Sequence, residues 1–319
     1  MYENKASKFR KVIDAVDKYE GIVSYLKYLT ENYGVDICIN DFCGFLQLDK
    51  QLAALMEPYH IHKNPFCLTI KSNSILWERC RHMKRGILLK SEKVQDTFYG
   101  MCYCGVGEYI VPILSGGAVI GVISVGEFCM HERLSAYRIR KISNEYGFDF
   151  PTLQKKFRES VRGNMIDSKL VKDLFTIAAD YFSSLYSSFV STHGNLNIRQ
   201  AKSYSNKAYI LSHAMEFIKQ NYQDKLTVKD ISKFCHCSES YLNHVFKKDK
   251  KINISAYINK TRTEQAKVLL LNSNSSIAEI ASKVGFSDPN YFSSVFKKIS
   301  GTPPTDYKKW FKAENNPLL

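Results

Sequence analysis

The strongest constraint on the fold is an octapeptide frame that occurs twice, as YLNHVFKK at residues 241–248 and as YFSSVFKK at residues 291–298. A pattern repeated at such a distance indicates that one structural unit occurs twice. On a helix, the second, fifth and sixth positions of each octapeptide share one face. Those positions are apolar in both copies: Leu242, Val245, Phe246, Phe292, Val295 and Phe296. We therefore expect two short amphipathic helices, each with a polar outer face and a Lys-Lys end.

A shorter helix is predicted just before each copy. Residues 226–235 have an apolar stripe, and Thr227 can cap the helix. Before the second copy, Ser276 and Glu279 have the spacing of a capping box. A short helix, a turn and a second helix form a helix-turn-helix unit, and the sequence predicts two such units.

The predicted turn differs between the two units. In the second unit, Gly285 ends the first helix where a left-handed residue is needed, and Pro289 stands in the first turn of the next helix. The first unit has His236 at the position of Gly285. A left-handed His is strained, although His tolerates this conformation better than most side chains do.

These residues carry a resemblance to a known family. The segment 280–308 (IASKVGFSDPNYFSSVFKKISGTPPTDYK) is similar to the C-terminal signature of AraC/XylS-type transcription regulators, and residues 257–262 resemble the start of that family's linking helix. The resemblance covers residues 207–311. It implies an all-α DNA-binding domain whose two helix-turn-helix units are joined by a long helix, expected around residues 255–271 and roughly 25 Å long.

A helix that enters the major groove presents its N-terminal and outer side chains to base edges. The predicted base contacts are Ser240, Asn243, His244, Asn290, Ser293 and Ser294. Asn can make paired hydrogen bonds to adenine, whereas Ser discriminates little between bases. We therefore expect the first unit to provide most of the base discrimination, and the second to rely on backbone contacts and groove shape.

Four lysines at the ends of these helices are the predicted phosphate contacts. They are Lys247, Lys248, Lys297 and Lys298. The alternative is that they only stabilise the helix C-termini, where positive charge is favourable.

The charge distribution agrees with a DNA partner. The formal net charge is +14, and residues 201–319 hold 19 Lys or Arg against 10 Asp or Glu. Concentrated positive charge is expected for phosphate binding, although a solvated lysine-rich surface has the same composition. The sequence begins without the apolar region of a signal peptide, and its longest apolar stretch, residues 109–125, is interrupted by Ser-Gly-Gly. We expect a cytoplasmic protein without membrane contact, with its nine cysteines unpaired.

The first two hundred residues predict a mixed domain. A helix is expected over residues 8–31, and strands are expected over residues 35–39, 97–102, 108–114 and 118–126, the last two joined by a turn at 115–117. Antiparallel strands with helices on one side favour a small α+β sensor domain, akin to PAS or GAF domains.

Three segments in this half, residues 64–72, 77–80 and 100–113, resemble the PocR-type sensory domain. The resemblance covers about residues 15–130. It implies a sensor of small diols and related hydrocarbon derivatives, placed ahead of an AraC-type domain. The chain departs from the family pattern after the third motif cysteine, where Tyr103 and Cys104 replace a His.

The predicted ligand-binding residues are Cys67, Trp77, Cys80, Cys102, Tyr103 and Glu108. Glu108 could hydrogen-bond a polyol hydroxyl, and Trp77 could form a pocket wall; a solvent-facing Glu and a core Trp are the alternatives. The cysteines can pack as small apolar residues, line the pocket, or act in metal or redox sensing. On a strand, Cys102 and Cys104 would point to the same face. We predict no cofactor and no resident metal.

A long helix is predicted over residues 168–189. Its apolar stripe consists of Leu170, Leu174, Ile177, Tyr181 and Leu185. This stripe can pack on the sensor domain or pair with a second subunit, and we favour a homodimer. The polar segment 193–206 is the predicted linker. The predicted organisation is a sensor domain (1–165), a connecting helix (166–192), the linker, and a DNA-binding domain (207–319).

The sequence thus predicts a ligand-responsive transcription regulator with no catalytic residues. We expect it to activate metabolic or uptake genes, with double-stranded DNA, a small-molecule effector and RNA polymerase as partners. The alternative is a redox- or metal-sensing regulator that uses the N-terminal cysteines. A cysteine alkyl-acceptor protein is a more distant alternative, because the chain lacks the Pro-Cys-His-Arg motif of that class.

Overall fold

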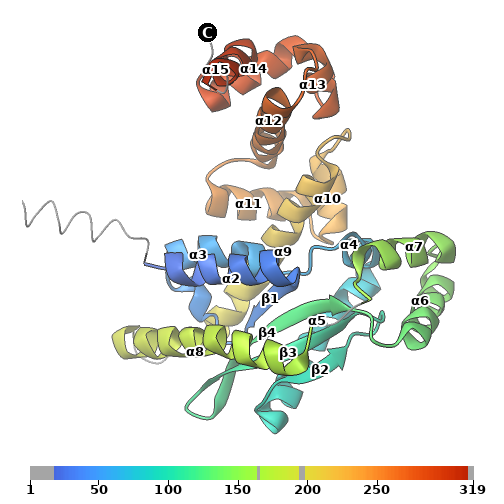
Figure 1. Cartoon of the computed structure of the whole chain (residues 1–319), viewed down its shortest axis with the longest axis vertical. Helices are drawn as coiled ribbons and strands as arrows, with labels where there is room; N and C mark the ends of the chain where they lie inside the picture. Colours follow the sequence, from blue (N-terminus) through green and yellow to red (C-terminus); the bar gives the residue numbers. More distant parts are fainter. Residues whose placement is uncertain (1–17, 164–165, 194–197, 315–319) are drawn as a thin grey trace, which may run out of the picture. The chain divides into compact units, whose positions relative to one another are not determined.

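A computed structural model of the chain describes residues 18–163, 166–193 and 198–314 (Figure 1). The chain divides into two compact units, the first ending at Tyr209 and the second beginning at Ile210. Each unit has a hydrophobic core of its own. Within the described residues, no helix combines the length and the apolar composition needed to cross a membrane.

The first unit is built on a four-stranded antiparallel sheet in the order β1-β4-β3-β2. Its strands are β1 (Asp36–Asp41), β2 (Phe98–Met101), β3 (Gly107–Ser115) and β4 (Ala118–Phe128). All four lie where the sequence predicted strands. Gly116 and Gly117, both with positive φ, make the tight turn between β3 and β4, because this kind of hairpin needs left-handed residues.

Helices surround this sheet. They are α2 (Glu20–Tyr33), α3 (Lys50–Met56), α4 (Pro65–Lys71), α5 (Ser74–Val94), α6 (Glu132–Tyr146), α7 (Phe150–Ser160) and α8 (Ser168–His193), with 3₁₀ turns at Phe45–Gln47 and Glu57–Tyr59. The first predicted helix is present as α2 from Glu20; its predicted beginning lies outside the described residues.

The two faces of the sheet belong to different parts of the interior. On β3, Val111 and Ile113 pack into the larger core with α8, whereas Ile110 packs on the opposite face beside Ile87 and Leu88 of α5. The expectation of helices on one side only was therefore wrong, since α8 and α5 cover opposite faces (Figure 1). The reason is visible in β3 and β4, whose nearly continuous apolar runs suit strands that are buried on both faces.

α8 packs along β3 with a different face from the predicted stripe. The buried side chains of α8 are Val171, Phe175, Ala178, Ala179, Phe182 and Phe189. Of the predicted stripe, Leu174, Tyr181 and Leu185 are partly buried at the margin of this core, while Leu170 and Ile177 are 37% and 58% exposed. The two stripes are neighbours on the helix, and periodicity alone did not identify the one that the sheet would cover.

α9 (Ile198–Asn221) runs through the boundary between the two units. It includes much of the segment predicted as a linker, of which residues 194–197 lie outside the described residues. The sequence there shows no amphipathic period, so the pattern contained no signal for this helix.

The second unit is entirely helical over its described residues. After α9 come α10 (Val228–Phe234), α11 (Glu239–Lys250), α12 (Ile254–Asn272), α13 (Ile277–Lys283), α14 (Pro289–Ser300) and α15 (Pro304–Glu314). The octapeptides form most of α11 and α14, and their Phe246, Phe292 and Phe296 are fully buried. Capping boxes begin α10 and α13, the first formed by Thr227 with Asp230 and the second by the predicted Ser276 and Glu279.

The turns before α11 and α14 both contain a left-handed residue, as the sequence predicted. His236 has φ +50° and Gly285 has φ +90°. A Cβ on Gly285 would lie 2.5 Å from the carbonyl oxygen of Tyr222, an impossible contact. Arg262 of α12 donates to the carbonyls of Tyr222 and Asp224 at 2.8 and 2.9 Å, which holds the backbone close to Gly285.

Candidate effector site and DNA-binding surface

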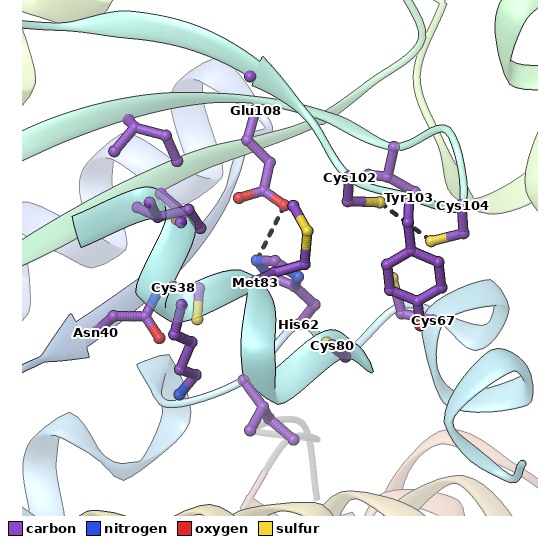
Figure 2. Close-up of a pocket in the computed structure, with 18 of the residues that line it drawn as sticks. Cys38, Asn40, His62, Cys67, Cys80, Met83, Cys102, Tyr103, Cys104 and Glu108 are labelled. Atoms are coloured by element: carbon purple, nitrogen blue, oxygen red, sulfur yellow. Dashed lines mark hydrogen bonds and ion pairs between the residues drawn. The ribbon is translucent and has the colours of Figure 1, made fainter. Parts of the chain in front are cut away.

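A cavity of about 280 Å³ lies between the sheet and α5 in the first unit (Figure 2). Residues from β1, α4, α5, the β2–β3 segment, β3 and β4 all reach it. Its polar lining comprises Asn40, His60, His62, Lys71, Lys84, Lys90, Glu108 and Ser124, and its sulfur-containing lining comprises Cys38, Cys67, Cys80, Met83, Met101, Cys102 and Cys104. Apolar walls with a few polar groups are typical of small-molecule sites.

Five of the six predicted ligand-binding residues line this cavity: Cys67, Cys80, Cys102, Tyr103 and Glu108. Trp77 does not. It is 3% exposed, and its ring makes an edge contact with Tyr209, the last residue of the first unit, which itself lines the cavity. Trp77 therefore packs against a residue of the cavity wall and does not contact the cavity itself.

Cys102 and Cys104 come together through a turn. The amide of Cys102 donates to the carbonyl of Val106, and the amide of Gly105 donates back to the carbonyl of Cys102, so the chain reverses just after β2. The two Sγ atoms are 3.0 Å apart. Their shared hydrogen bond lowers the pKa of Cys102 and, together with burial, raises the pKa of Cys104. The predicted strand 97–102 contained Cys102 but not Cys104, and the turn that brings the two sulfurs together was not predicted.

His62 and Glu108 form the central polar pair of the cavity, with His62 Nε2 and Glu108 Oε1 3.5 Å apart. Burial lowers the pKa of His62, and the nearby Glu108 opposes that shift. Sequence reasoning missed His62, although it stands two residues before the motif that begins at Asn64.

Two other polar groups of the cavity are buried without a hydrogen-bond partner among the described residues. They are Oδ1 of Asn40 on β1 and Oγ of Ser124 on β4, in residues 7% and 2% exposed. A buried polar atom without a partner is costly, so such atoms mark places where a ligand can complete the hydrogen bonding. Neither residue was identified from the sequence, because only strand pairing brings them to this wall.

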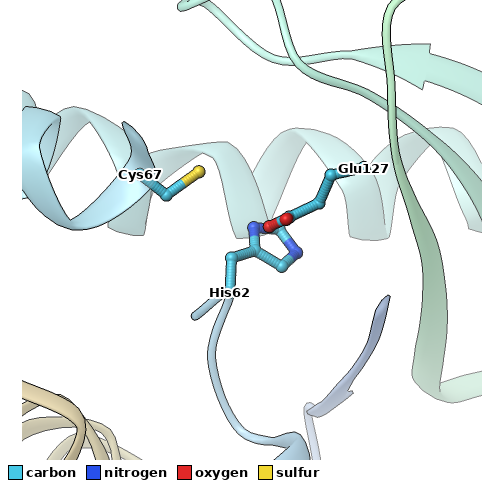
Figure 3. Close-up of side chains that lie close together, drawn as sticks. All are labelled: His62, Cys67 and Glu127. Carbon is cyan, nitrogen blue, oxygen red and sulfur yellow. The ribbon is translucent and has the colours of Figure 1, made fainter. Parts of the chain in front are cut away.

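Three groups that can bind metals lie together at one side of the cavity (Figure 3). One ligand atom each of His62, Cys67 and Glu127 lies within 4.8 Å of the other two. Glu127 is 2% exposed. Burial raises its pKa to about 8, and the neighbouring Asp36 and Glu108 act in the same direction. The sequence prediction included Cys67 but neither of its two partners.

In the second unit, the predicted base contacts lie on α11 and near the start of α14. Ser240, His244, Asn290 and Ser294 are exposed, and Asn243 and Ser293 are half-buried. The hydroxyl groups of Ser293 and Ser294 donate to the carbonyls of Pro289 and Asn290 at 2.9 and 3.0 Å. In this conformation the two hydroxyl hydrogens are used within the helix, and each hydroxyl would have to break its backbone hydrogen bond before it could donate to DNA.

The four predicted phosphate contacts, Lys247, Lys248, Lys297 and Lys298, are all exposed in the last turns of α11 and α14. Two further exposed residues stand beside these predicted contacts and were not among them. Tyr241 and Tyr291, at the first position of each octapeptide, are 38% and 53% exposed. The signal for them was the same aromatic residue at an outward position in both copies.

Comparisons with known proteins agree with this division. Residues 18–186 match the family model of the sensory domain found in PocR, and residues 231–309 match that of a helix-turn-helix domain. Regulatory protein PocR from Salmonella typhimurium is 24% identical over 260 residues, which make up 79% of this chain and 84% of that protein.

Other relatives match a smaller share of the chain. The bifunctional transcriptional activator/DNA repair enzyme AdaA from Bacillus subtilis is 35% identical over 99 residues, or 31% of this chain and 47% of AdaA. Only the DNA-binding domain matches, so the alkyl-acceptor alternative receives no support. The solved C-terminal domain of AraT, a response regulator from Geobacillus stearothermophilus, is 32% identical, covers 32% of this chain and 84% of that chain, and has a TM-score of 0.31.

The sensory-domain match spans more than half of the chain, and the DNA-binding match follows it in the order that the sequence predicted. The chain belongs to the AraC-type transcription regulators that carry a PocR sensory domain.

Proposed function

We propose that this regulator senses a small diol or polyol in the cavity between α5 and the sheet. The proposal depends on two polar atoms of residues that line this cavity, Asn40 Oδ1 and Ser124 Oγ. Among the described residues, neither atom has a hydrogen-bond partner. A hydroxyl group can both donate and accept a hydrogen bond, so the hydroxyl groups of one polyol can donate to Asn40 Oδ1 and also bond the Ser124 hydroxyl. His62 and Glu108 provide a further polar contact, and the surrounding apolar residues suit the carbon chain.

The effector would act on DNA binding through the helices around the sensor. Tyr209 lines the cavity and belongs to α9, which continues into the second unit. A ligand that changes the position of Tyr209 therefore acts on a helix shared by both units. To switch DNA binding, the ligand must stabilise one of two positions of α9 relative to the other by a few kcal/mol.

On DNA, we propose that the two helix pairs act as two helix-turn-helix units and that α12 holds them apart. α12 has 19 residues, about 28 Å at 1.5 Å per residue. Successive major-groove faces lie about 34 Å apart, so one chain can reach two of them. Activation through RNA polymerase is the expected output, and AdaA, which shares this domain, is named a transcriptional activator.

We also propose that the regulator is a homodimer. Leu170 and Ile177 of α8 are exposed apolar side chains on a helix whose other face is already covered by the sheet. A second α8 could cover them. Analytical ultracentrifugation of wild type and Ile177→Asp tests this, with a dimer expected for wild type and a shift toward monomer for the variant. A monomeric wild type would contradict the proposal.

The test of the sensor function is calorimetric titration of the full chain with propane-1,2-diol and glycerol, with butan-1-ol as the apolar control. We expect diol binding that Ser124→Ala and Asn40→Leu each weaken by about 1–3 kcal/mol, because each removes a buried hydrogen bond to the ligand. Ser143→Ala is the matched control, since Ser143 Oγ is also buried without a partner among the described residues but lies outside the cavity. Equal binding of butan-1-ol would contradict polyol recognition.

The 3.0 Å separation of the Cys102 and Cys104 sulfurs favours a second candidate, a redox sensor. Oxidation by peroxide would form one S–S bond, with both thiol hydrogens and two electrons passing to the peroxide to give two waters. Mass spectrometry of peroxide-treated protein would show the loss of two hydrogens between these residues. DNA binding that responds to peroxide in wild type but not in Cys104→Ser would favour this candidate over the polyol sensor.

A further inference from the structure

Three side chains from two distant segments of the sequence converge beside the effector cavity. His62 lies in the segment before α4, Cys67 in the first turn of α4, and Glu127 near the end of β4. Figure 3 shows the imidazole, the thiol and the carboxylate directed toward a common point. Their ligand atoms lie within 4.8 Å of one another, and they are one nitrogen, one sulfur and one oxygen.

Glu127 is the member of this group whose position most needs an explanation. Its side chain is almost fully buried, and neither carboxylate oxygen has a hydrogen-bond partner among the described residues. A buried carboxylate without hydrogen bonds is expensive unless a cation lies against it. The geometry of this buried carboxylate, with neither oxygen partnered by the described residues, therefore points to a cation that binds here.

We propose that His62, Cys67 and Glu127 bind one divalent transition-metal ion of the zinc class, with a fourth coordination position open to the cavity. Mixed nitrogen, sulfur and oxygen donors suit Zn²⁺, whereas all-oxygen donor sets select harder cations. His62 and Cys67 line the cavity and Glu127 does not, so the ion would have the carboxylate behind it and the cavity in front. Three protein ligands with one open position are the arrangement of zinc sites that exchange a ligand.

The charges of the group balance with such an ion. A thiolate and a carboxylate together neutralise Zn²⁺, and the protons that leave Cys67 and Glu127 on binding pass to solvent. A tetrahedral site with bonds of about 2.0–2.3 Å places donor atoms roughly 3.5 Å apart. The three ligand atoms lie at most 4.8 Å apart, so the most widely separated pair would move closer by about 1 Å when the ion binds.

Groups around the three donors hold them as the outer shell of a metal site does. Glu108 lies 3.5 Å from His62 Nε2, which leaves Nδ1 as the nitrogen that we assign to the ion. A carboxylate on the far nitrogen of a ligating imidazole is a common orienting contact. Asn64 donates to Sγ of Cys67 at 3.3 Å, and the amide of Cys67 donates to Oδ1 of Asn64 at 2.6 Å. The thiol is thus fixed by the Asn64 side chain.

The test is the metal content of the full chain after reconstitution with Zn²⁺ and removal of free metal, measured by elemental mass spectrometry. We expect one equivalent per chain in wild type, and binding weakened on the order of 100-fold or more in Cys67→Ser, His62→Gln and Glu127→Gln, because removing a ligand exceeds the effect of removing an outer-shell contact. Cys80→Ser is the matched control, since Cys80 lines the same cavity outside the group.

Replacement of zinc by Co²⁺ gives a readout that assigns the sulfur. The thiolate-to-cobalt charge-transfer band should be present in wild type, Cys80→Ser and Cys102→Ser, and absent in Cys67→Ser. Azide should perturb the cobalt d–d bands if the fourth position is open. A band that disappears in Cys102→Ser but persists in Cys67→Ser, a wild-type protein that retains no metal, or cobalt bands unchanged by azide would each overturn the proposal.

Thermal unfolding separates a metal ligand from a structural role for Glu127. Zinc should raise the Tm of wild type and leave the Tm of Glu127→Gln unchanged, because an ion that binds only the folded state stabilises it. If Glu127 served only to pair with Lys71, zinc would shift neither protein, and the proposal would fail. None of these readouts depends on a polyol or on DNA, so they can fail while the proposed sensor function stands.

Discussion

On α11 and α14, which we propose as the recognition helices, the exposed residues are not equivalent between the two copies. The Ser293 and Ser294 hydroxyls donate to the helix backbone, so each must give up that hydrogen bond to donate to a base. Asn243 and His244 of α11 carry an amide and an imidazole at the matching positions, and these groups can both donate and accept. The unequal division of labour expected from the sequence therefore gains a physical reason, and it remains a prediction.

Asn243→Ala and His244→Ala should each cost about 1–3 kcal/mol of binding to a cognate site and relax specificity at the bases they contact. Ser293→Ala and Ser294→Ala are the matched changes on α14 and should cost less, since they remove no free donor. Quantitative mobility shifts on a randomised operator measure both effects. A larger loss of affinity in the serine variants would reverse the assignment.

The left-handed turn residues make a second matched pair. Gly285→Ala should lower the free energy of unfolding by at least about 1–3 kcal/mol, because its Cβ would lie 2.5 Å from the Tyr222 carbonyl oxygen and its φ is +90°. His236→Gly, at φ +50°, should be neutral or stabilising by up to about 1 kcal/mol, because it relieves strain. Urea unfolding of both variants measures the difference, and a stabilising Gly285→Ala would be inconsistent with this geometry.

At the scale of elements, α8 shows why an apolar stripe in the sequence does not by itself tell which face of a helix packs against the sheet. Two neighbouring stripes run along this helix, and the sheet covers the one that contains Phe175 and Phe182. The stripe predicted from the sequence lies at the margin, with Ile177 exposed. Helix periodicity gives the orientation of side chains to within a face, but packing against β3 decides which of two adjacent faces is buried.

Phe175→Ala should therefore destabilise the first unit by about 3–5 kcal/mol, because it opens a cavity in the core. Ile177→Ala, two positions away and 58% exposed in the single chain, should change the stability of the monomer by less than about 0.5 kcal/mol. Urea unfolding of the two variants, at protein concentrations low enough to keep the chain monomeric, compares the faces directly. Similar losses of stability in both variants would mean that the predicted stripe is buried within the single chain.

For the whole molecule, the uneven distribution of positive charge is the property that we expect to govern DNA binding. Residues 201–319 carry a surplus of nine positive charges, 19 against 10, out of the net +14. Four of the lysines concerned end α11 and α14, where they are exposed. The location of the charges, and not only their sum, should govern the salt dependence of binding.

The double variant Lys297→Gln/Lys298→Gln should weaken binding to all sequences alike and reduce the slope of log K against log salt by roughly 1 for each phosphate that is no longer neutralised. Lys141→Gln/Lys155→Gln, which removes the same charge from the first unit, is the control and should leave the slope nearly unchanged. Binding isotherms at several salt concentrations measure both. Equal slopes for the two double variants would support the alternative that these lysines only stabilise the helix ends.

By itself, the sequence determined the features that depend on neighbours in the chain. The repeated octapeptide, the capping residues and the turn glycines predicted the helices of the second unit, and apolar runs bounded by turns predicted the four strands, because these signals act over a few residues. Five of six predicted cavity residues also come together, since they belong to the motifs that resemble the PocR-type sensory domain.

Only the tertiary structure decided which residues from distant segments come together at the cavity and beside it. Strand pairing brings Asn40 and Ser124 to the wall of the cavity, and the end of β4 brings Glu127 to His62 and Cys67, about sixty residues earlier in the chain. No local pattern marks such residues, because their roles arise from contacts between segments that are far apart in sequence. The cavity forms between α5 and one face of the sheet while α8 covers the other face, and helices on both faces follow from burial of the whole sheet rather than from any one strand.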